Sequence, residues 1–281
     1  MMKREEKSKS SLHEDVITHY SSGYEEKRLD INEGKIERER TRELLQRFLP
    51  PTPATIIDSG GGTGKHALWL ARKGYEVHLV DIVPLHIELA KEESAQQPEY
   101  PLSSAEVGDA CTLNRNDNSV DAALLFGPLY HLTDKRDRLI ALSEAYRVLR
   151  KGGVLMAVGI SRFASTFDGL RSEYLKDPKF VEIVNGDLKN GLHKNFTDNP
   201  FYFMDTFFHH PNELKAELAE VGFSDSRVYG VEGPSWLAPN IDEWWKDEAQ
   251  RNVLLEIARR LESEPTLLGI SSHLMAVGVK G

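Results

Sequence analysis

Short apolar runs alternate with amphipathic stretches through the middle of the chain. The runs are typical of strands buried on both faces of a sheet, and they lie at residues 54–58, 76–81, 105–109, 120–126 and 154–160. The stretches between them, such as 66–73, 84–94 and 135–149, carry apolar residues at helical spacing. This alternation predicts a doubly wound α/β fold, in which a mostly parallel sheet is covered by helices on both faces.

The alternation breaks after residue 160 and then resumes. Residues 161–205 are rich in aromatic side chains but show no simple order of strand and helix. We therefore expect a helical insertion at about residues 162–206, over the carboxyl edge of the sheet. Beyond it the pattern predicts a helix at 211–221, a strand at 226–231, one long helix at 241–262 and a last strand at 273–279.

The first 50 residues precede the alternating region and have a different pattern. Apolar residues recur at helix-compatible spacing between Ser11 and Leu49, and Asn32 is placed to cap a helix there. The prolines at positions 50, 51 and 53 end this pattern. We therefore expect an N-terminal helical segment over residues 1–50 and a main domain over residues 51–281.

The composition is that of an ordinary globular protein, with 40% hydrophobic and 28% charged residues. The formal net charge of −9 disfavours DNA or RNA as the main partner, because a negative field repels phosphate. The single cysteine, Cys111, cannot form an internal disulfide, and no apolar run is long enough to span a membrane. The N-terminal lysines are not followed by the apolar stretch of a secretory signal. These features predict a cytoplasmic protein.

A glycine-rich turn, Asp58-Ser59-Gly60-Gly61-Gly62-Thr63-Gly64, lies where the first strand turns into a helix. Backbone N–H groups at such a helix N-terminus face an incoming ligand, and glycine allows a close approach. A phosphate-binding loop of the type G-x-x-x-x-G-K-[ST] would need glycine at Ser59 and a hydroxyl at His66, so that match fails. A dinucleotide motif G-x-G-x-x-G would need glycine at Lys65 or Thr63, so that match fails as well.

The spacing that fits is acidic-x-G-x-G-x-G, from Asp58 through Gly60, Gly62 and Gly64. It resembles the first motif of the class I S-adenosylmethionine-dependent methyltransferases. The resemblance covers residues from about 54 to 160 and extends more loosely to both ends. It implies a Rossmann-like sheet of seven strands with an antiparallel C-terminal strand, and S-adenosylmethionine as the cofactor.

Three further segments resemble cofactor-binding positions of this family. Asp81 ends the second strand, 17 residues after Gly64, where a carboxylate binds the ribose hydroxyls. Residues 108–110 resemble the adenine-binding position, and the loop at 126–131 resembles the one beside the methionine part and the transferred methyl. The contacts implied in this core are Gly60, Gly62, Gly64, Asp81, Ile82, Asp109, Ala110, Phe126, Gly127 and Leu129.

Each of the three aspartates also has a structural alternative. Asp58 is placed to hydrogen-bond the glycine turn. Asp81 can be a solvated carboxylate at a strand end, and Asp109 can cap the next turn.

The segment from His19 to Arg28 resembles lids that fold over the cofactor in small-molecule methyltransferases. The resemblance implies that Tyr20 and Tyr24 close on the sulfonium, because an aromatic face attracts positive charge. Arg28 then pairs with the carboxylate of the cofactor. The alternative is an ordinary amphipathic helix with charge on its surface.

The implied reaction is transfer of the methyl group by in-line displacement to a small-molecule acceptor, which needs alignment and no metal. Neither H-E-x-x-H nor C-x-x-C occurs. His131 is the candidate general base, because an imidazole on the loop nearest the methyl can take a proton; the alternative is a packed loop histidine. Ligands of such folds bind outside the carboxyl ends of the strands. The acceptor-binding candidates are Tyr130, Arg162, Phe163, His193, Asn195, Tyr202, His209, His210, Glu232 and Trp236.

Two other functions stay open at the level of sequence. One is methylation of RNA or protein, and the other is a non-catalytic protein that binds S-adenosylmethionine. Residues 126–130 depart from the [DN]-P-P-[YF] motif, since Gly127 and Leu129 replace required residues, which disfavours methylation of planar amide or amino nitrogens.

Overall fold

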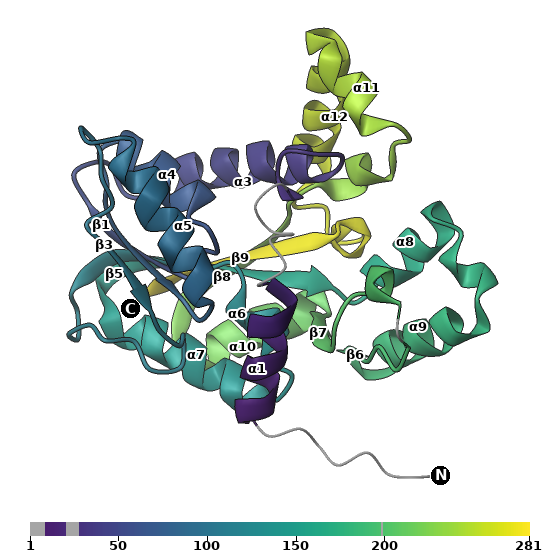
Figure 1. The fold of residues 1–281 in the computed structure, drawn as a ribbon, viewed down its shortest axis with the longest axis horizontal. Helices are drawn as coiled ribbons and strands as arrows, with labels where there is room; N and C mark the ends of the chain where they lie inside the picture. The colour runs from purple at the N-terminus through teal and green to yellow at the C-terminus, as the bar shows by residue number, and fades with distance from the viewer. Residues whose placement is uncertain (1–8, 21–27, 198) are drawn as a thin grey trace.

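The computed structural model describes residues 9–20, 28–197 and 199–281, arranged as Figure 1 shows. The α-helices are α1 (Lys9–Tyr20), α3 (Gly34–Phe48), α4 (Lys65–Arg72), α5 (Pro84–Ala95), α6 (Pro128–His131), α7 (Lys135–Val148), α8 (Ala164–Arg171), α9 (Pro178–Asn190), α10 (Pro211–Val221), α11 (Ile241–Lys246) and α12 (Glu248–Leu261). The strands are β1 (Thr55–Ser59), β2 (Glu76–Asp81), β3 (Ser104–Val107), β4 (Val120–Leu125), β5 (Leu149–Ser161), β6 (Leu192–His193), β7 (Thr206–His209), β8 (Phe223–Gly230) and β9 (His273–Lys280). None of the helices in the described part of the chain is long and apolar enough to cross a membrane.

Seven strands form the main sheet, in the order β3-β2-β1-β4-β5-β9-β8. Neighbouring strands from β3 to β5 are parallel, whereas β9 lies antiparallel between β5 and β8. The expected Rossmann-like sheet with an antiparallel C-terminal strand is therefore confirmed. The sequence pattern did not predict β6 and β7, which extend the sheet to nine strands among the described residues.

The central strands are buried on both faces, which explains their continuous apolar runs. Successive side chains of a strand point to opposite faces, so Ile57 packs in the core beneath α7 and α10, and Ile56 packs in the core beneath α3, α4 and α5. Figure 1 shows these two groups of helices on opposite sides of the sheet. Because these helices cover the two faces of the sheet, the carboxyl ends of its strands form an open edge of the domain.

Strand β5 is longer than its neighbour β4 at this edge. The last residue of β4, Leu125, pairs with Ala157, whereas β5 continues to Ser161. The overhanging end of β5 pairs with β7 on one side and with β9 on the other. The expected insertion starts where this overhang ends, carries α8 and α9, and lies at the carboxyl edge of the sheet (Figure 1). It has a small core of its own, formed by Phe180, Ile183, Val184 and Tyr202.

Two local expectations are wrong. The helix expected over 241–262 is two helices, because Asp247 has extended backbone dihedrals and its side chain accepts a hydrogen bond from the N–H of Gln250 (2.9 Å), which caps α12. Asn32 does not cap a helix, since α3 begins at Gly34 and Asn32 has a φ of 45°. The N–H of Asn32 instead donates to the Asp242 carboxylate (3.0 Å).

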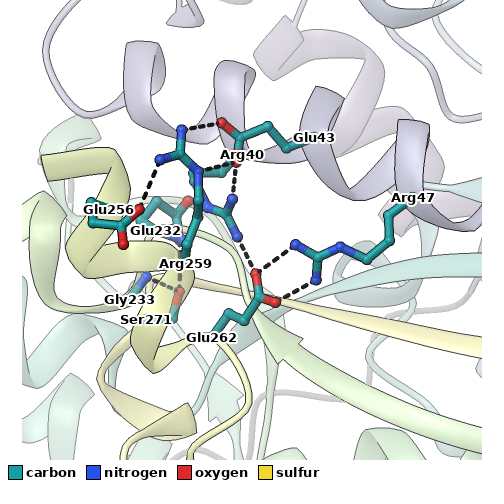
Figure 2. Close-up of polar contacts among 9 residues, drawn as sticks. All are labelled: Arg40, Glu43, Arg47, Glu232, Gly233, Glu256, Arg259, Glu262 and Ser271. Carbon is teal, nitrogen blue, oxygen red and sulfur yellow. Dashed lines mark hydrogen bonds and ion pairs between the residues drawn. The ribbon is translucent and has the colours of Figure 1, made fainter. Parts of the chain in front are cut away.

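A network of ion pairs joins α3 to α12, as Figure 2 shows. The side chain of Arg40 has no exposed surface and pairs with both Glu43 and Glu262. Arg47 also pairs with Glu262, and Arg259 donates to Glu43 (2.7 Å). Because Glu262 follows the last residue of α12, this network ties the N-terminal helix α3 to the C-terminal part of the chain.

We expect Glu262→Gln to destabilise the fold by about 3 kcal/mol, because it removes one of the carboxylates that neutralise a fully buried guanidinium. Urea unfolding of the purified protein measures this free energy. The matched control is Glu256→Gln, whose partners Arg259 and Arg260 are more exposed, and which we expect to change stability by less than about 1 kcal/mol. Equal effects of the two substitutions would contradict a stabilising role of the buried pair.

Candidate cofactor and acceptor site

The loops that follow β1, β2, β3 and β4 meet at one cavity on the carboxyl edge of the sheet. The strands are parallel and in register there: Ser59 at the end of β1 pairs with Val80 and Leu125, and Asp81 pairs with Val107. Parallel strands bring their following loops together in this way. The cavity is lined by Val16, Tyr20, Arg28, Leu29, Glu37, Thr41, Asp58, Gly60, Gly61, Gly62, Thr63, Lys65, His66, Asp81, Ile82, Val83, His86, Gly108, Asp109, Ala110, Phe126, Gly127, Pro128, Tyr130, His131, Leu132, Val158, Val231 and His273.

The glycine turn adopts a backbone that other residues rarely take. Gly60, Gly62 and Gly64 have φ values of 74°, 57° and 80°. Gly60 also lies against the loop after β4, because a Cβ atom there would come within 2.4 Å of Pro128. Gly60 and Gly62 line the cavity with backbone, whereas Gly64 lies outside the lining and forms the N-cap of α4.

Asp81 connects the glycine turn to the loop after β2. Its carboxylate accepts hydrogen bonds from the N–H of Gly62 (2.8 Å) and of Val83 (2.9 Å), and it contacts Nδ1 of His86 at 3.1 Å. The side chain is buried and lines the cavity, so the alternative of a solvated strand-end carboxylate is not what the structure shows. Ribose binding by Asp81 stays a prediction.

Asp58 is a buried carboxylate at the base of the cavity. Among the described residues neither of its oxygens has a hydrogen-bond partner, so the expected hydrogen bond to the glycine turn is not formed. Burial raises the pKa of Asp58 to about 7, and the negative charge of Asp81 adds to this rise. A cationic group entering beside Asp58 would supply the partner that the described part of the chain does not.

The remaining core positions divide into two groups. Ile82, Asp109, Ala110, Phe126 and Gly127 line the cavity, as the resemblance implies. The Asp109 carboxylate also accepts the N–H of Cys111 (2.8 Å), so the turn-capping alternative is present together with the cavity position. Leu129 is not in the lining: its side chain is fully buried and packs in the core beneath α7.

The N-terminal segment covers part of the cavity. Tyr20, the last residue of α1, is buried, and its hydroxyl lies 3.0 Å from Nε2 of His131. Arg28 lines the cavity and pairs with Glu37 through both terminal nitrogens. Tyr24 lies outside the described residues. The roles of Tyr20 and Arg28 toward a cofactor stay predictions.

His131 has the environment of a packed, neutral histidine. Burial lowers its pKa to about 3, and the nearby His19 adds to the decrease. A general base works best with a pKa near the operating pH, so this geometry favours the packed alternative over proton abstraction. The hydrogen-bond partner of the His131 imidazole is the Tyr20 hydroxyl, which belongs to the segment that covers the cavity.

Of the predicted acceptor residues, Tyr130 lines the cavity, and its hydroxyl donates to the carbonyl of Phe126 (3.1 Å). Trp236 does not line it, because the ring is buried and Nε1 donates to the carbonyl of Ile270 (2.8 Å). Arg162 is held by an ion pair with Glu213 at the base of the insertion. Neither Trp236 nor Arg162 lines the cavity, contrary to the prediction that they contact the acceptor.

Two of the three predicted acceptor histidines, His193 and His209, also lie in packed interiors away from this cavity. His193 is buried in the insertion between Asp187 (3.0 Å) and the carbonyl of Tyr202 (2.7 Å). His209 is fully buried beside Glu217 (3.3 Å), which also binds Arg138. Both predictions are corrected by these partners, which hold the imidazoles in structural hydrogen bonds.

Sequence reasoning missed Glu37, His66 and His273, which the fold brings to the cavity. His66 is the second residue after Gly64, the end of the glycine turn, so its position in the first turn of α4 was an available signal. Burial lowers the pKa of His66 to about 4. Glu37 and His273 lie at opposite ends of the chain, and no local pattern indicates that they meet.

The comparisons with known proteins agree with this geometry. The methyltransferase domain family matches residues 57–157, which span the strands and loops that build the cavity. The chain is 29% identical over 182 residues to the ubiquinone/menaquinone biosynthesis C-methyltransferase UbiE of Zymomonas mobilis, covering 64% of this chain and 73% of that protein. These matches support a class I S-adenosylmethionine-dependent methyltransferase.

Two further similarities bear on the extent of the match. An uncharacterized methyltransferase of Mycobacterium bovis is 33% identical to the present chain. The match covers 43% of the present chain and 45% of the Mycobacterium protein. The crystal structure of a methyltransferase from Methanosarcina mazei superposes with a TM-score of 0.55 at 21% identity, covering 84% of this chain and 96% of that one, which shows the same fold.

The residues of this methyltransferase fit S-adenosylmethionine, which carries an ammonium and a sulfonium cation. The buried, unpartnered Asp58 carboxylate would hold a cation. Thr63 Oγ1 and Nε2 of His86 are further buried polar atoms in the lining that have no partner among the described residues. Gly60 and Gly62 would bring backbone close to the ligand, while Ile82 and Ala110 supply apolar contact.

We expect Asp58→Asn to weaken S-adenosylmethionine binding at least about 10-fold, because it removes a buried charge that faces a cation. The same variant has a second signature. The folded pKa of about 7 exceeds the ordinary 3.8, so wild-type stability falls as pH rises from about 4 to about 7.

The asparagine does not ionise, so in the cofactor-free protein the variant should gain about 2 kcal/mol relative to wild type between pH 5 and pH 8. Calorimetry measures the affinity and urea unfolding measures the stability. Unchanged affinity together with a pH-independent stability difference would show that Asp58 is neither buried as a charge nor a cofactor ligand.

Proposed function

We propose that this methyltransferase acts on a small, partly apolar molecule that binds inside the same cavity as the cofactor. The observation that carries the proposal is the continuity of the cavity. Beyond the glycine turn it extends to Val158 on β5, to Val231 after β8 and to His273 on β9. The apolar and aromatic side chains of Leu29, Phe126, Tyr130, Val158 and Val231 line this further part, which we call the acceptor half.

The cover over the cavity supports a small acceptor. Tyr20 and Leu29 are buried with 9% and 5% of their surface exposed, so the N-terminal segment packs onto the site instead of leaving a wide groove. A folded RNA or protein substrate would have to displace this segment. The net charge of −9 also opposes an RNA substrate. The similarity to UbiE of Zymomonas mobilis, a C-methyltransferase of ubiquinone/menaquinone biosynthesis, is consistent with a small acceptor here.

S-adenosylmethionine, when bound, supplies an electrophilic methyl group. The contribution of the chain is alignment in a site from which water is excluded. The glycine turn and Asp81 would fix the position of the cofactor, and Phe126, Tyr130 and Val158 would hold the acceptor beside it. His131, neutral and bonded to Tyr20, would position the N-terminal cover above both.

The test is to incubate the enzyme with S-adenosylmethionine labelled in its methyl group and with a cell extract, and to separate small molecules, RNA and protein. We expect the label in the small-molecule fraction, because only that fraction fits beneath the buried cover. Asp81→Ala, which removes the contacts that hold the glycine turn, is the inactive control. Label recovered mainly in RNA or protein would overturn the proposal.

His131→Gln and Tyr20→Phe provide a second test, because both delete the same hydrogen bond. We expect each variant to lower kcat/KM about 5-fold. The pH dependence between pH 5 and 9 should keep its shape in both, since burial lowers the pKa of His131 to about 3 and the imidazole stays neutral over this range. If an acidic limb of the wild-type profile disappeared in His131→Gln but not in Tyr20→Phe, His131 would be the general base.

A further inference from the structure

A cluster of four charged or titratable side chains lies along the acceptor half of the cavity. Arg28, Glu37 and His273 line the cavity, and Glu232 is buried behind His273. Arg28 donates to both oxygens of Glu37. Nδ1 of His273 lies 2.6 Å from Glu232 and 3.8 Å from Glu37. The four residues come from the segment before α3, from α3, from the segment after β8 and from β9, so only the folded chain assembles them.

Glu232 fixes the imidazole of His273 in one orientation. One oxygen of Glu232 binds Nδ1, and the other accepts from the backbone N–H of His273 (2.9 Å) and from the Ser271 hydroxyl (2.9 Å). Figure 2 shows Glu232 beside Ser271. Nε2 is then the remaining polar atom of the ring, and it has no hydrogen bond to another residue within the described ranges. The His273 side chain keeps 17% of its surface exposed, on the side of the cavity that it lines.

The surroundings of His273 favour its protonated form. Burial alone would lower its pKa, but the charges of Glu37 and Glu232 outweigh burial and the opposing charge of Arg28 and raise the pKa to about 9. Glu37 is ionised, because Arg28 and His273 hold its pKa at about 2 against the effect of burial. At neutral pH the imidazolium therefore donates from Nε2 and cannot accept a proton there.

The wall around this donor is apolar. Val158 and Val231 line the cavity beside His273, and Ile160 is its partner in the pairing of β5 with β9. Phe126 and Tyr130 close the acceptor half toward the loop after β4. A fixed cationic donor in an apolar and aromatic wall is complementary to an aromatic ring that bears a negatively charged oxygen.

We propose that His273, oriented by Glu232, binds a phenolate oxygen of the acceptor. This inference rests on the proposed function, because it assumes that a small molecule occupies the acceptor half. His273 selects acceptors that carry an ionisable ring hydroxyl, and it places that oxygen at the β9 wall. Glu232 is a positioning residue, and Glu37 keeps Arg28 from facing the same oxygen as a free cation.

A metal ion is the competing occupant of this cluster, since the ligand atoms of Glu37, Glu232 and His273 lie within 4.8 Å of one another. Their existing partners disfavour it. Arg28 takes both oxygens of Glu37, and Ser271 and His273 take those of Glu232. The phenolate is therefore the occupant that leaves every described contact in place.

The probes are 4-nitrophenol, which is ionised at pH 8, and its neutral methyl ether, 4-nitroanisole. Calorimetry is performed on the full chain saturated with S-adenosylhomocysteine. We expect the phenolate to bind wild-type protein more tightly than the ether, and His273→Gln to weaken phenolate binding about 10-fold. Affinity for the ether and for S-adenosylhomocysteine should not change, which also shows that the variant is folded.

Glu232→Gln tests the positioning role through the pH dependence of phenolate binding, which a purely structural role of Glu232 would not change. In wild-type protein the phenolate affinity should fall as pH rises through about 9, where the imidazolium loses its proton. Removing the charge of Glu232 lowers the pKa of His273, so the same fall should occur at a lower pH in the variant. Adding Zn²⁺ should have no effect on either titration.

The proposal is overturned if wild-type protein does not prefer the phenolate to the ether, or if His273→Gln leaves the phenolate affinity unchanged. Phenolate binding that requires Zn²⁺ would replace it with a metal site. The methyl-labelling experiment separates these failures from that of the proposed function. Label in RNA or protein refutes the small-molecule acceptor, whereas label in small molecules together with phenolate binding indifferent to His273 refutes only this inference.

Discussion

The Asp81 carboxylate bonds to two loops at once, and the cavity depends on that contact. A glycine turn has no side chains with which to fix its own shape, so its conformation must come from backbone contacts. The N–H of Gly62 donates to Asp81 from one side, and Gly60 lies against Pro128 on the other. The turn is therefore held between the loops after β2 and β4. The positions of Asp58 beneath it and of His66 at the start of α4 follow from this arrangement.

Much of the fold and of the cofactor region could be predicted because the signals are local. The part of a strand that is buried on both faces, such as 122–125 of β4, has to be apolar, and the turn after 55–59 has to be glycine at positions with positive φ. Asp81 follows from its place at the end of a strand. The break at Asp247 was missed because helical spacing continues across it, and only the capping contact to Gln250 marks the boundary.

The acceptor side could not be predicted in the same way, because burial and pairing there are decided by distant residues. His193, His209 and Trp236 have side chains that could bind a ligand, but each of them forms a hydrogen bond in the interior of the fold instead. Glu37 and His273 show the opposite case. Neither stands in a motif, and they come together only because β9 inserts between β5 and β8, beneath α3.

The overhanging end of β5 connects two parts of the molecule that differ in purpose. Val158 and Ile160 lie beyond the last pair with β4, and the chain passes from them directly into the insertion, which has its own small core. The glycine turn, Asp58 and Asp81 belong to strands on the far side of β4. Within the described part of the chain, no residue between 162 and 206 lines the cavity. Exchanging the insertion for that of a relative would therefore leave the residues around the acceptor and the adenosyl group in place, which makes the boundary near residue 161 a natural joint for building chimaeric enzymes.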